Sequence, residues 1–244
     1  MKKLIISILM LSGIFTMASA EVGVKIGVTA QLGEMQTSGK EVSSATGGGT
    51  ETAAAEKGLF ATAGYFIEKD LAFLPGPFAR ISIGYDNIAH DLDLGKQSNV
   101  RSNYNGTSDG NVSLGAGGTD AAGNQEDAVN TLSADITGFS TLYATLNLTD
   151  WLYVKTGQVT VDVKTKFDGS STSAYKTNHE LDGTMYGVGI QSMNNDNGMF
   201  FRLEYNDYSI DGTTVKNTGT DSTFTATLNE VSGTTTRISV GKSF

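Results

Sequence analysis

Residues 22–32, VGVKIGVTAQL, carry the pattern on which the fold prediction rests. Every second residue from Val22 to Leu32 is apolar, and the residues between them are glycine or polar. Successive side chains of a β-strand point to opposite faces, so this alternation predicts a strand with one apolar face and one polar face.

The same alternation returns in seven further segments. These are residues 59–67, 79–85, 132–148, 152–163, 186–190, 201–205 and 238–244. Within residues 152–163 the apolar side chains change face, which predicts a β-bulge near residues 155–158. Together the segments predict an all-β protein, most simply of eight strands.

The links between these segments alternate in length. Residues 33–55 and 91–130 are long and rich in Gly, Ser, Thr, Asn and Asp, whereas residues 68–77, 149–150 and 193–198 are shorter links. Transmembrane barrels have long extracellular loops and short periplasmic turns. We therefore predict a transmembrane antiparallel up-and-down β-barrel with four long extracellular loops. Two points stay open: the count is ten strands if residues 91–130 contain a hairpin, and residues 209–230 are either one long hairpin tip or include a part of the last strand at residues 224–228.

The N-terminus has the composition of an export signal. Lys2 and Lys3 precede an apolar run, and Ala18-Ser19-Ala20 supplies the small residues that a signal peptidase recognises. The run is shorter than the roughly 20 residues that a membrane-spanning helix needs. We expect residues 1–20 to be a signal peptide cleaved at the site formed by Ala18 and Ala20. Residues 21–244 would then form one barrel domain in the outer membrane of a Gram-negative bacterium.

Charge and composition argue against several kinds of partner. The formal net charge is −9, whereas nucleic-acid phosphates are bound by clustered Lys and Arg, so we expect no nucleic-acid partner. The chain has no cysteine and only two histidines, and no metal-ligand spacing is present. We expect neither a cofactor nor a metal.

The C-terminus adds a family resemblance. Phe244 is the last residue, with Ile238 and Val240 upstream on the same predicted face. This resembles the assembly signal of outer-membrane barrels, although Lys242 stands where that signal usually has an apolar or aromatic residue. Over its whole mature length the chain looks like the small OmpA/OmpX-like and opacity-protein barrels. The resemblance implies outer-membrane lipid, lipopolysaccharide and the barrel-assembly machinery as partners.

The polar faces of the predicted strands carry charges that we expect inside the barrel. An eight-stranded barrel is just wide enough to be filled by side chains, so these charges should pair across the lumen. We favour a closed, salt-bridged interior over a gated path for ions. The predicted lumen residues are Lys25, Arg80, Asp135, Asp162, Lys164, Arg202 and Glu204.

Aromatic residues gather near the short links, where an interfacial girdle is expected. They are Tyr65, Phe78, Trp151, Tyr153, Phe200 and Phe201.

For function, we expect a structural or surface-interaction role, such as adhesion or recognition through the loops, with a surface ligand that the sequence does not identify. One alternative is a small-solute channel, and a minor one is a lipid-modifying enzyme. The enzyme would need His90 or His179, beside Glu180, close to a serine at the membrane edge. Because nothing in the sequence fixes such a geometry, we expect no enzyme.

Overall fold

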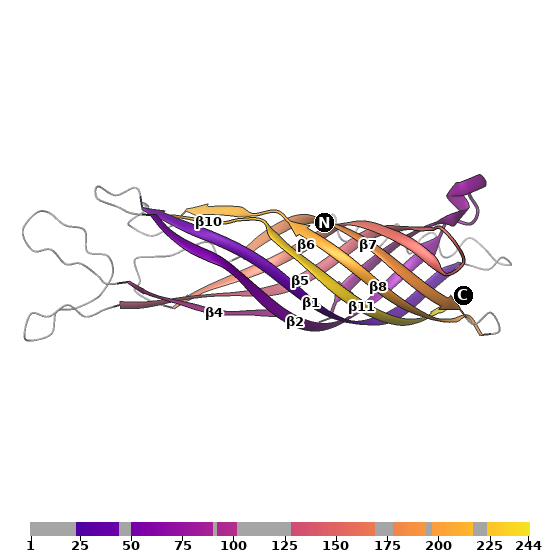
Figure 1. The fold of residues 1–244 in the computed structure, drawn as a ribbon, viewed down its shortest axis with the longest axis horizontal. Helices are drawn as coiled ribbons and strands as arrows, with labels where there is room; N and C mark the ends of the chain where they lie inside the picture. Colours follow the sequence, from indigo (N-terminus) through magenta and orange to yellow (C-terminus); the bar gives the residue numbers. More distant parts are fainter. Residues whose placement is uncertain are drawn as a thin grey trace, which may run out of the picture.

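The computed structural model describes residues 23–43, 50–89, 92–101, 128–168, 178–193, 197–216 and 224–244. They form an elongated β-barrel (Figure 1). The strands are β1 (Val24–Ser43), β2 (Thr50–Asp70), β3 (Ile81–Ile88), β4 (Leu92–Arg101), β5 (Ala128–Asn147), β6 (Leu152–Asp168), β7 (Asn178–Met193), β8 (Met199–Ile210), β9 (Thr213–Lys216), β10 (Phe224–Leu228) and β11 (Val231–Ser243). A short 3-10 helix, η1 (Gly76–Arg80), precedes β3. No helix among the described residues is long and apolar enough to cross a bilayer.

Eight strands close the ring, in the order β1-β2-β3-β5-β6-β7-β8-β11 and back to β1, and every neighbouring pair is antiparallel. Beyond the ring, β4 pairs with β5, while β10 pairs with β1 and β9 with β10. The prediction of an eight-stranded antiparallel barrel is therefore confirmed, and the ten-stranded alternative is wrong.

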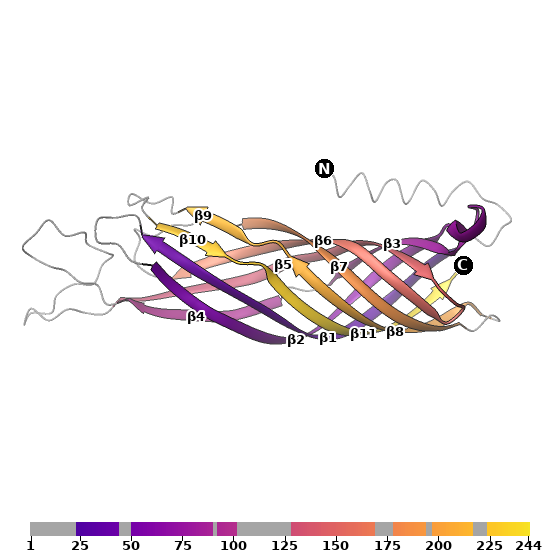
Figure 2. The ribbon, with the colours of Figure 1, turned by 45° about the horizontal axis from the view of Figure 1, so that its top comes forward.

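The ends of the barrel differ, and we name them by their connections. The turn end carries η1, the links between β5 and β6 and between β7 and β8, and the C-terminus (Figure 1). The loop end carries β4, β9 and β10, and Figure 2 shows β9 and β10 beside the tip of β1. Turns are built locally: the Thr149 hydroxyl accepts the backbone N–H of Leu152 at 2.9 Å, and Gly198 adopts a positive φ of 70°.

Strands reach further toward the loop end than predicted. Much of the predicted loop 33–55 is strand, because β1 pairs with β2 up to the Val42–Thr50 pair, through one irregularity between Thr37 and Gly39. Similarly, β4 occupies part of the predicted loop 91–130. Residues 224–228 form a separate strand, β10, which follows the edge of β1 just beyond β11 and pairs with β9. They are therefore not part of the last strand, and the hairpin alternative for residues 209–230 is the one that the structure supports. Glycine and threonine do not prevent strands where a paired neighbour supplies the backbone hydrogen bonds.

The predicted bulge at residues 155–158 is absent. β6 pairs with β7 in one unbroken register, and its side chains alternate strictly, with Tyr153, Lys155 and Val159 buried. The irregularity lies in β5 instead, where Ile136 and Gly138 pair with consecutive residues of β6 and Thr137 is the extra residue. This bulge turns Ile136 into the interior.

The change of apolar face along β6 has a different cause, because the chemistry of the barrel inverts along its length. Toward the turn end the exterior is apolar and the interior polar, as shown by exposed Val154 and buried Lys155. Toward the loop end the interior is apolar, as shown by Val159 and Val161, which are 0% and 1% exposed. We call this buried cluster the apolar plug. It comprises Met35, Ile136, Phe139, Tyr143, Val159, Val161, Val163, Leu181, Met185, Tyr208 and Ile210.

Candidate functional site

The polar interior near the turn end is the richest chemical feature of the described residues. Because side chains alternate along each strand, one residue in two of β1, β2, β3, β6, β8 and β11 enters the lumen. We call the charged set the lumen network. It comprises Lys25, Glu68, Asp70, Asp86, Lys155, Arg202, Glu204 and Arg237.

Glu68 of β2 is the centre of one half of the network. Its carboxylate accepts two hydrogen bonds of 2.8 Å from the Arg202 guanidinium, one to each oxygen, and one of 3.2 Å from Lys25. The Tyr143 hydroxyl donates another at 3.2 Å. Glu68 is fully buried, so these donors replace the water that the carboxylate loses on burial.

The Arg202 guanidinium also lies against aromatic rings. Its central carbon is 4.8 Å from the centroid of the Phe200 ring, 5.3 Å from that of Tyr153 and 5.5 Å from that of Phe66. A guanidinium packs well against ring faces, so the charge is held between a carboxylate and apolar surface. Because Glu68 lies on β2 and Arg202 on β8, the contact joins opposite parts of the ring.

Asp86 and Glu204 form the other half. Arg237 of β11 contacts Asp86 of β3 at 2.5 Å and Glu204 of β8 at 3.3 Å. Lys155 of β6 lies 3.4 Å from Asp86 and 3.6 Å from Glu204. Tyr153 donates to Glu204 at 2.7 Å. The two acids and two bases therefore form a closed square that crosses the lumen.

The lumen network is balanced in charge, with four basic and four acidic side chains. Each buried charge has an opposite partner, which is the condition under which such groups are tolerated in an interior. No group of three or more potential metal ligands occurs in the described part of the chain. The arrangement links strands across the lumen and occupies the polar part of the interior.

The structure brings three of the predicted lumen residues together, namely Lys25, Arg202 and Glu204. Arg80 lies outside instead, because η1 ends there before β3 begins, and its side chain donates to the Leu148 carbonyl at 3.0 Å. Asp162 also does not enter the lumen, since its neighbours Val161 and Val163 are the inward residues of β6, and Lys164 is exposed. The backbone of Asp135 belongs to β5, and its side chain is outside the described part.

The sequence prediction missed Glu68, Asp70, Asp86, Lys155 and Arg237. Asp86 and Arg237 lie on the polar faces of two predicted strands. Assigning every residue of those faces to the lumen would have found them. Glu68 was assigned to a link, but β2 continues to Asp70. Lys155 was hidden by the bulge expected at its position.

The predicted aromatic girdle is correct in part. Tyr65, Phe78, Trp151 and Phe201 are exposed on the outside. Tyr153 and Phe200 are instead buried, because they occupy inward positions of β6 and β8. Two exposed tyrosines that the prediction omitted, Tyr186 and Tyr205, lie where the exterior changes from apolar to polar.

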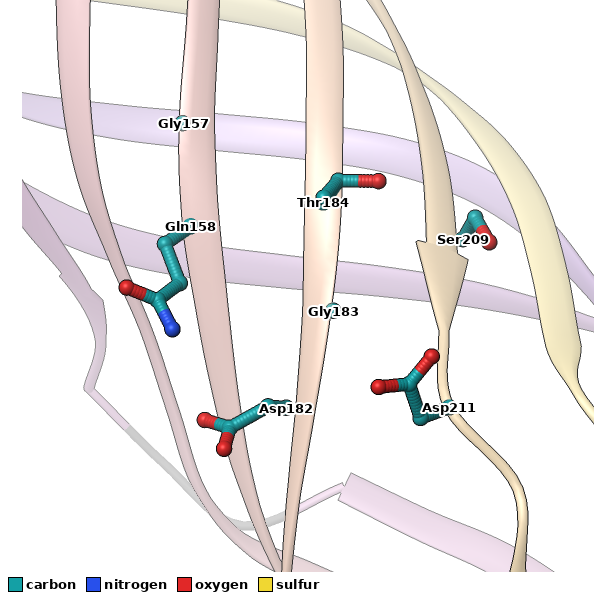
Figure 3. A pocket seen from close by; sticks show the side chains of 7 residues that line it. All are labelled: Gly157, Gln158, Asp182, Gly183, Thr184, Ser209 and Asp211. Atoms are coloured by element: carbon teal, nitrogen blue, oxygen red, sulfur yellow. The ribbon is translucent and has the colours of Figure 1, made fainter.

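A hollow on the outer wall is the other candidate. It has a volume of about 380 Å³ and lies across β6, β7 and β8 (Figure 3). In Figure 3, Asp182 lies on the middle strand, with Gln158 and Asp211 on either side. The lining residues are Gly157, Gln158, Asp182, Gly183, Thr184, Ser209 and Asp211. The lining has no histidine, lysine or arginine, and its titratable groups are the carboxylates of Asp182 and Asp211.

Of the residues named for the enzyme alternative, His179 and Glu180 lie near the start of β7. Their partners on β6 are Val163 and Asp162, so no serine faces them across that ladder. His90 lies outside the described residues.

The C-terminal residues take lipid-facing positions. Ile238 and Val240 are exposed on the outer face of β11, and Phe244 is also exposed. The Lys242 ammonium lies 5.2 Å from the centroid of the Phe244 ring, so the residue that departs from the assembly signal packs against its terminal aromatic. Ala18 and Ala20 of the predicted cleavage site lie outside the described residues.

No model of a protein family matches the sequence, and no curated protein does. Among solved structures, the chain is similar to a FadL homologue from Pseudomonas aeruginosa, with 7% identity, a TM-score of 0.36 and coverage of 91% of this chain and 90% of that one. It is similar to the outer membrane protease OmpT from Escherichia coli, with 10% identity, a TM-score of 0.34 and coverage of 94% and 99%. It is also similar to the translocator domain of the autotransporter NalP from Neisseria meningitidis, with 10% identity, a TM-score of 0.29 and coverage of 96% of this chain and 92% of that one. The closed ladder, the apolar exterior and the polar interior are those of an outer-membrane β-barrel.

Proposed function

We propose that this chain is an integral protein of the bacterial outer membrane, and that its barrel is a closed anchor for surface-exposed loops. The role is structural or adhesive, with recognition of a surface ligand by the loop end. The observation that carries the proposal is the lumen network, because paired charges from opposite strands fill the interior where a channel would need open space.

The exterior supports the membrane part of the proposal. Apolar side chains such as Val188, Leu203 and Val240 are exposed on β7, β8 and β11, a surface that lipid would cover. Lipid and lipopolysaccharide are therefore the partners that we assign to the outer wall. We assign insertion of the chain to the barrel-assembly machinery, with Ile238, Val240 and Phe244 as its recognition signal.

A paired experiment tests the closed anchor. The mature chain is refolded in detergent, its gel migration is compared with and without heating, and the same sample is added to a planar bilayer. We expect a shift in apparent mass on heating and no conductance steps. Regular, reproducible steps would contradict the closed anchor and favour the small-solute channel.

The enzyme alternative has its own test. We expect lipid A from cells that carry His179→Ala to match lipid A from cells with the unchanged protein, by mass spectrometry. A modification of lipid A that disappears in the variant would contradict the structural role.

A further inference from the structure

Near the lumen network and the apolar plug, several buried polar groups lack a full set of protein partners. The hydroxyls of Thr62 and Thr141 and both polar atoms of the Asn206 side chain make no hydrogen bond to any described residue, and the Thr235 hydroxyl has only the Tyr208 hydroxyl within reach. All four residues are at most 5% exposed. Buried polar groups without partners are costly and rare, so a cluster of them indicates a bound polar molecule.

Two of the four residues, Asn206 and Thr141, lie between one inward side chain that belongs to or contacts the lumen network and one that belongs to the apolar plug. On β8, Asn206 lies between Glu204 of the network and Tyr208 of the plug. On β5, Thr141 lies between Tyr143 and Phe139.

Register connects the other two residues to Asn206 and to the lumen network. Thr235 is the partner of Asn206 across β11 and β8. Thr62 pairs with Gln31, which pairs in turn with Arg237 of the network. A Cβ on Gly33 would collide with both Phe60, which packs on the plug, and Thr235, so both side chains lie against this glycine. These four inward residues therefore lie next to the lumen network along their strands or in register with it, and we call them the polar layer.

The inward residues that β6 and β7 contribute near the polar layer are small. Gly157 on β6 separates Lys155 of the network from Val159 of the plug, and Gly187 on β7 follows Met185 by one inward position. A Cβ on Gly187 would collide with the Asn206 amide oxygen. Glycine and threonine therefore line a level where larger side chains fill the lumen above and below.

The hydrogen-bonding groups of the polar layer indicate which kind of molecule binds there. Hydroxyls and one amide offer both donors and acceptors but no charge. The lumen network beside the layer is already balanced, with four acids and four bases, so no counter-ion is required. A neutral molecule that both donates and accepts fits these groups, and water is the usual occupant of such sites.

We propose that the polar layer binds a cluster of water molecules, enclosed by the lumen network toward the turn end and by the apolar plug toward the loop end. This inference rests on the closed lumen of the proposed function. The water satisfies Asn206 and the three threonines at the level where the interior changes from ionic to apolar.

Nuclear magnetic resonance of the isotope-labelled barrel in detergent micelles tests the proposal directly. We expect the side-chain amide protons of Asn206 to show cross-relaxation with water of the sign that marks long-lived contacts. The exposed Gln158 side-chain amide on the outer wall is the control, since its water exchanges rapidly. Absence of long-lived water at Asn206 would overturn the proposal.

Stability gives an independent readout. Thr62→Val and Thr141→Val keep the shape of the side chain and remove the group that would bind water. If the layer is hydrated, both variants unfold at a lower urea concentration than the unchanged barrel, because the water cluster loses a partner. If the hydroxyls are dry, replacing them by methyl groups raises the midpoint, which would contradict the proposal, as would an unchanged midpoint. Thr156→Val on the exposed outer face is the matched control.

These outcomes separate the inference from the proposed function. A barrel that conducts ions would overturn the closed lumen. A barrel that does not conduct and shows no bound water at Asn206 would overturn the water cluster alone.

Discussion

The two halves of this barrel share one hydrogen-bonded ladder and have opposite chemistry. Toward the turn end, β7 exposes Val188 and Ile190 to the outside, while toward the loop end it exposes Asp182 and Thr184 and buries Met185. Register carries this boundary to the neighbouring strands, since Tyr186 pairs with Thr156 of β6 and with Asp207 of β8.

The difference shows that the surroundings of each half determine its pattern. A strand in lipid must expose apolar side chains and can keep its polar groups inside. A strand in water does the reverse and needs an apolar core. The half near the loop end therefore has the construction of a water-exposed barrel that continues from the membrane-embedded half.

The largest expected effect is in the ionic interior. Glu68→Gln leaves the buried Arg202 without a carboxylate, while Lys25 keeps its contact with Asp70, and breaking a buried pair in this way costs about 3–5 kcal/mol. Equilibrium unfolding in urea measures the loss. The control is Glu34→Gln, which removes an exposed pair with Lys57 and should change the stability by less than about 1 kcal/mol. Equal losses in the two variants would show that the lumen network does not hold the barrel together.

In the apolar plug, Met185→Ala should cost about 2–5 kcal/mol, because Met185 is fully buried and its removal leaves a cavity. The same unfolding experiment measures it. Val188→Ala, three residues away and exposed on the outer face, should cost less, since lipid fills the space that is left. A larger loss at Val188 than at Met185 would contradict an apolar core at the loop end.

A smaller expected effect locates the boundary between the lipid-facing and the water-facing parts of the outer surface. Val188→Lys places a charge on the lipid-facing surface and should cost about 2–4 kcal/mol if the site is deep in the bilayer. Thr184→Lys lies beyond Tyr186 on the same face of β7 and should cost about 0–1 kcal/mol. Folding into lipid vesicles measures both. Similar losses would place both positions in the same environment.

Much of the fold could be predicted because period-two alternation is a strong signal where one face meets lipid. It located the ring strands and the lipid-facing side chains of β11. It failed at Val159, Val161 and Val163, where the apolar residues moved to the other face. A bulge and an inversion of the surroundings give the same local pattern, and only the neighbouring strands distinguish them.

Within the site, Lys25, Arg202 and Glu204 could be predicted because each lies in the polar phase of a clear strand. Their partners could not be assigned, since pairing across the lumen joins β2 with β8 and β3 with β11. Such contacts depend on the closure of the ring, which no local segment contains. Glu68 shows the cost of an inaccurate strand end, because a shift of a few residues removed the most connected acid of the network.

The inversion of the outer surface is the central claim, and cysteine scanning of β7 tests it most directly. The chain has no native cysteine, so single substitutions can be labelled without background. Cysteines are placed at the outward positions 180, 182, 184, 188 and 190, and the barrel in lipid vesicles is treated with a membrane-impermeant maleimide. The account predicts labelling at positions 180, 182 and 184 and protection at 188 and 190. Protection at 182 and 184, or uniform labelling of all five positions, would contradict it.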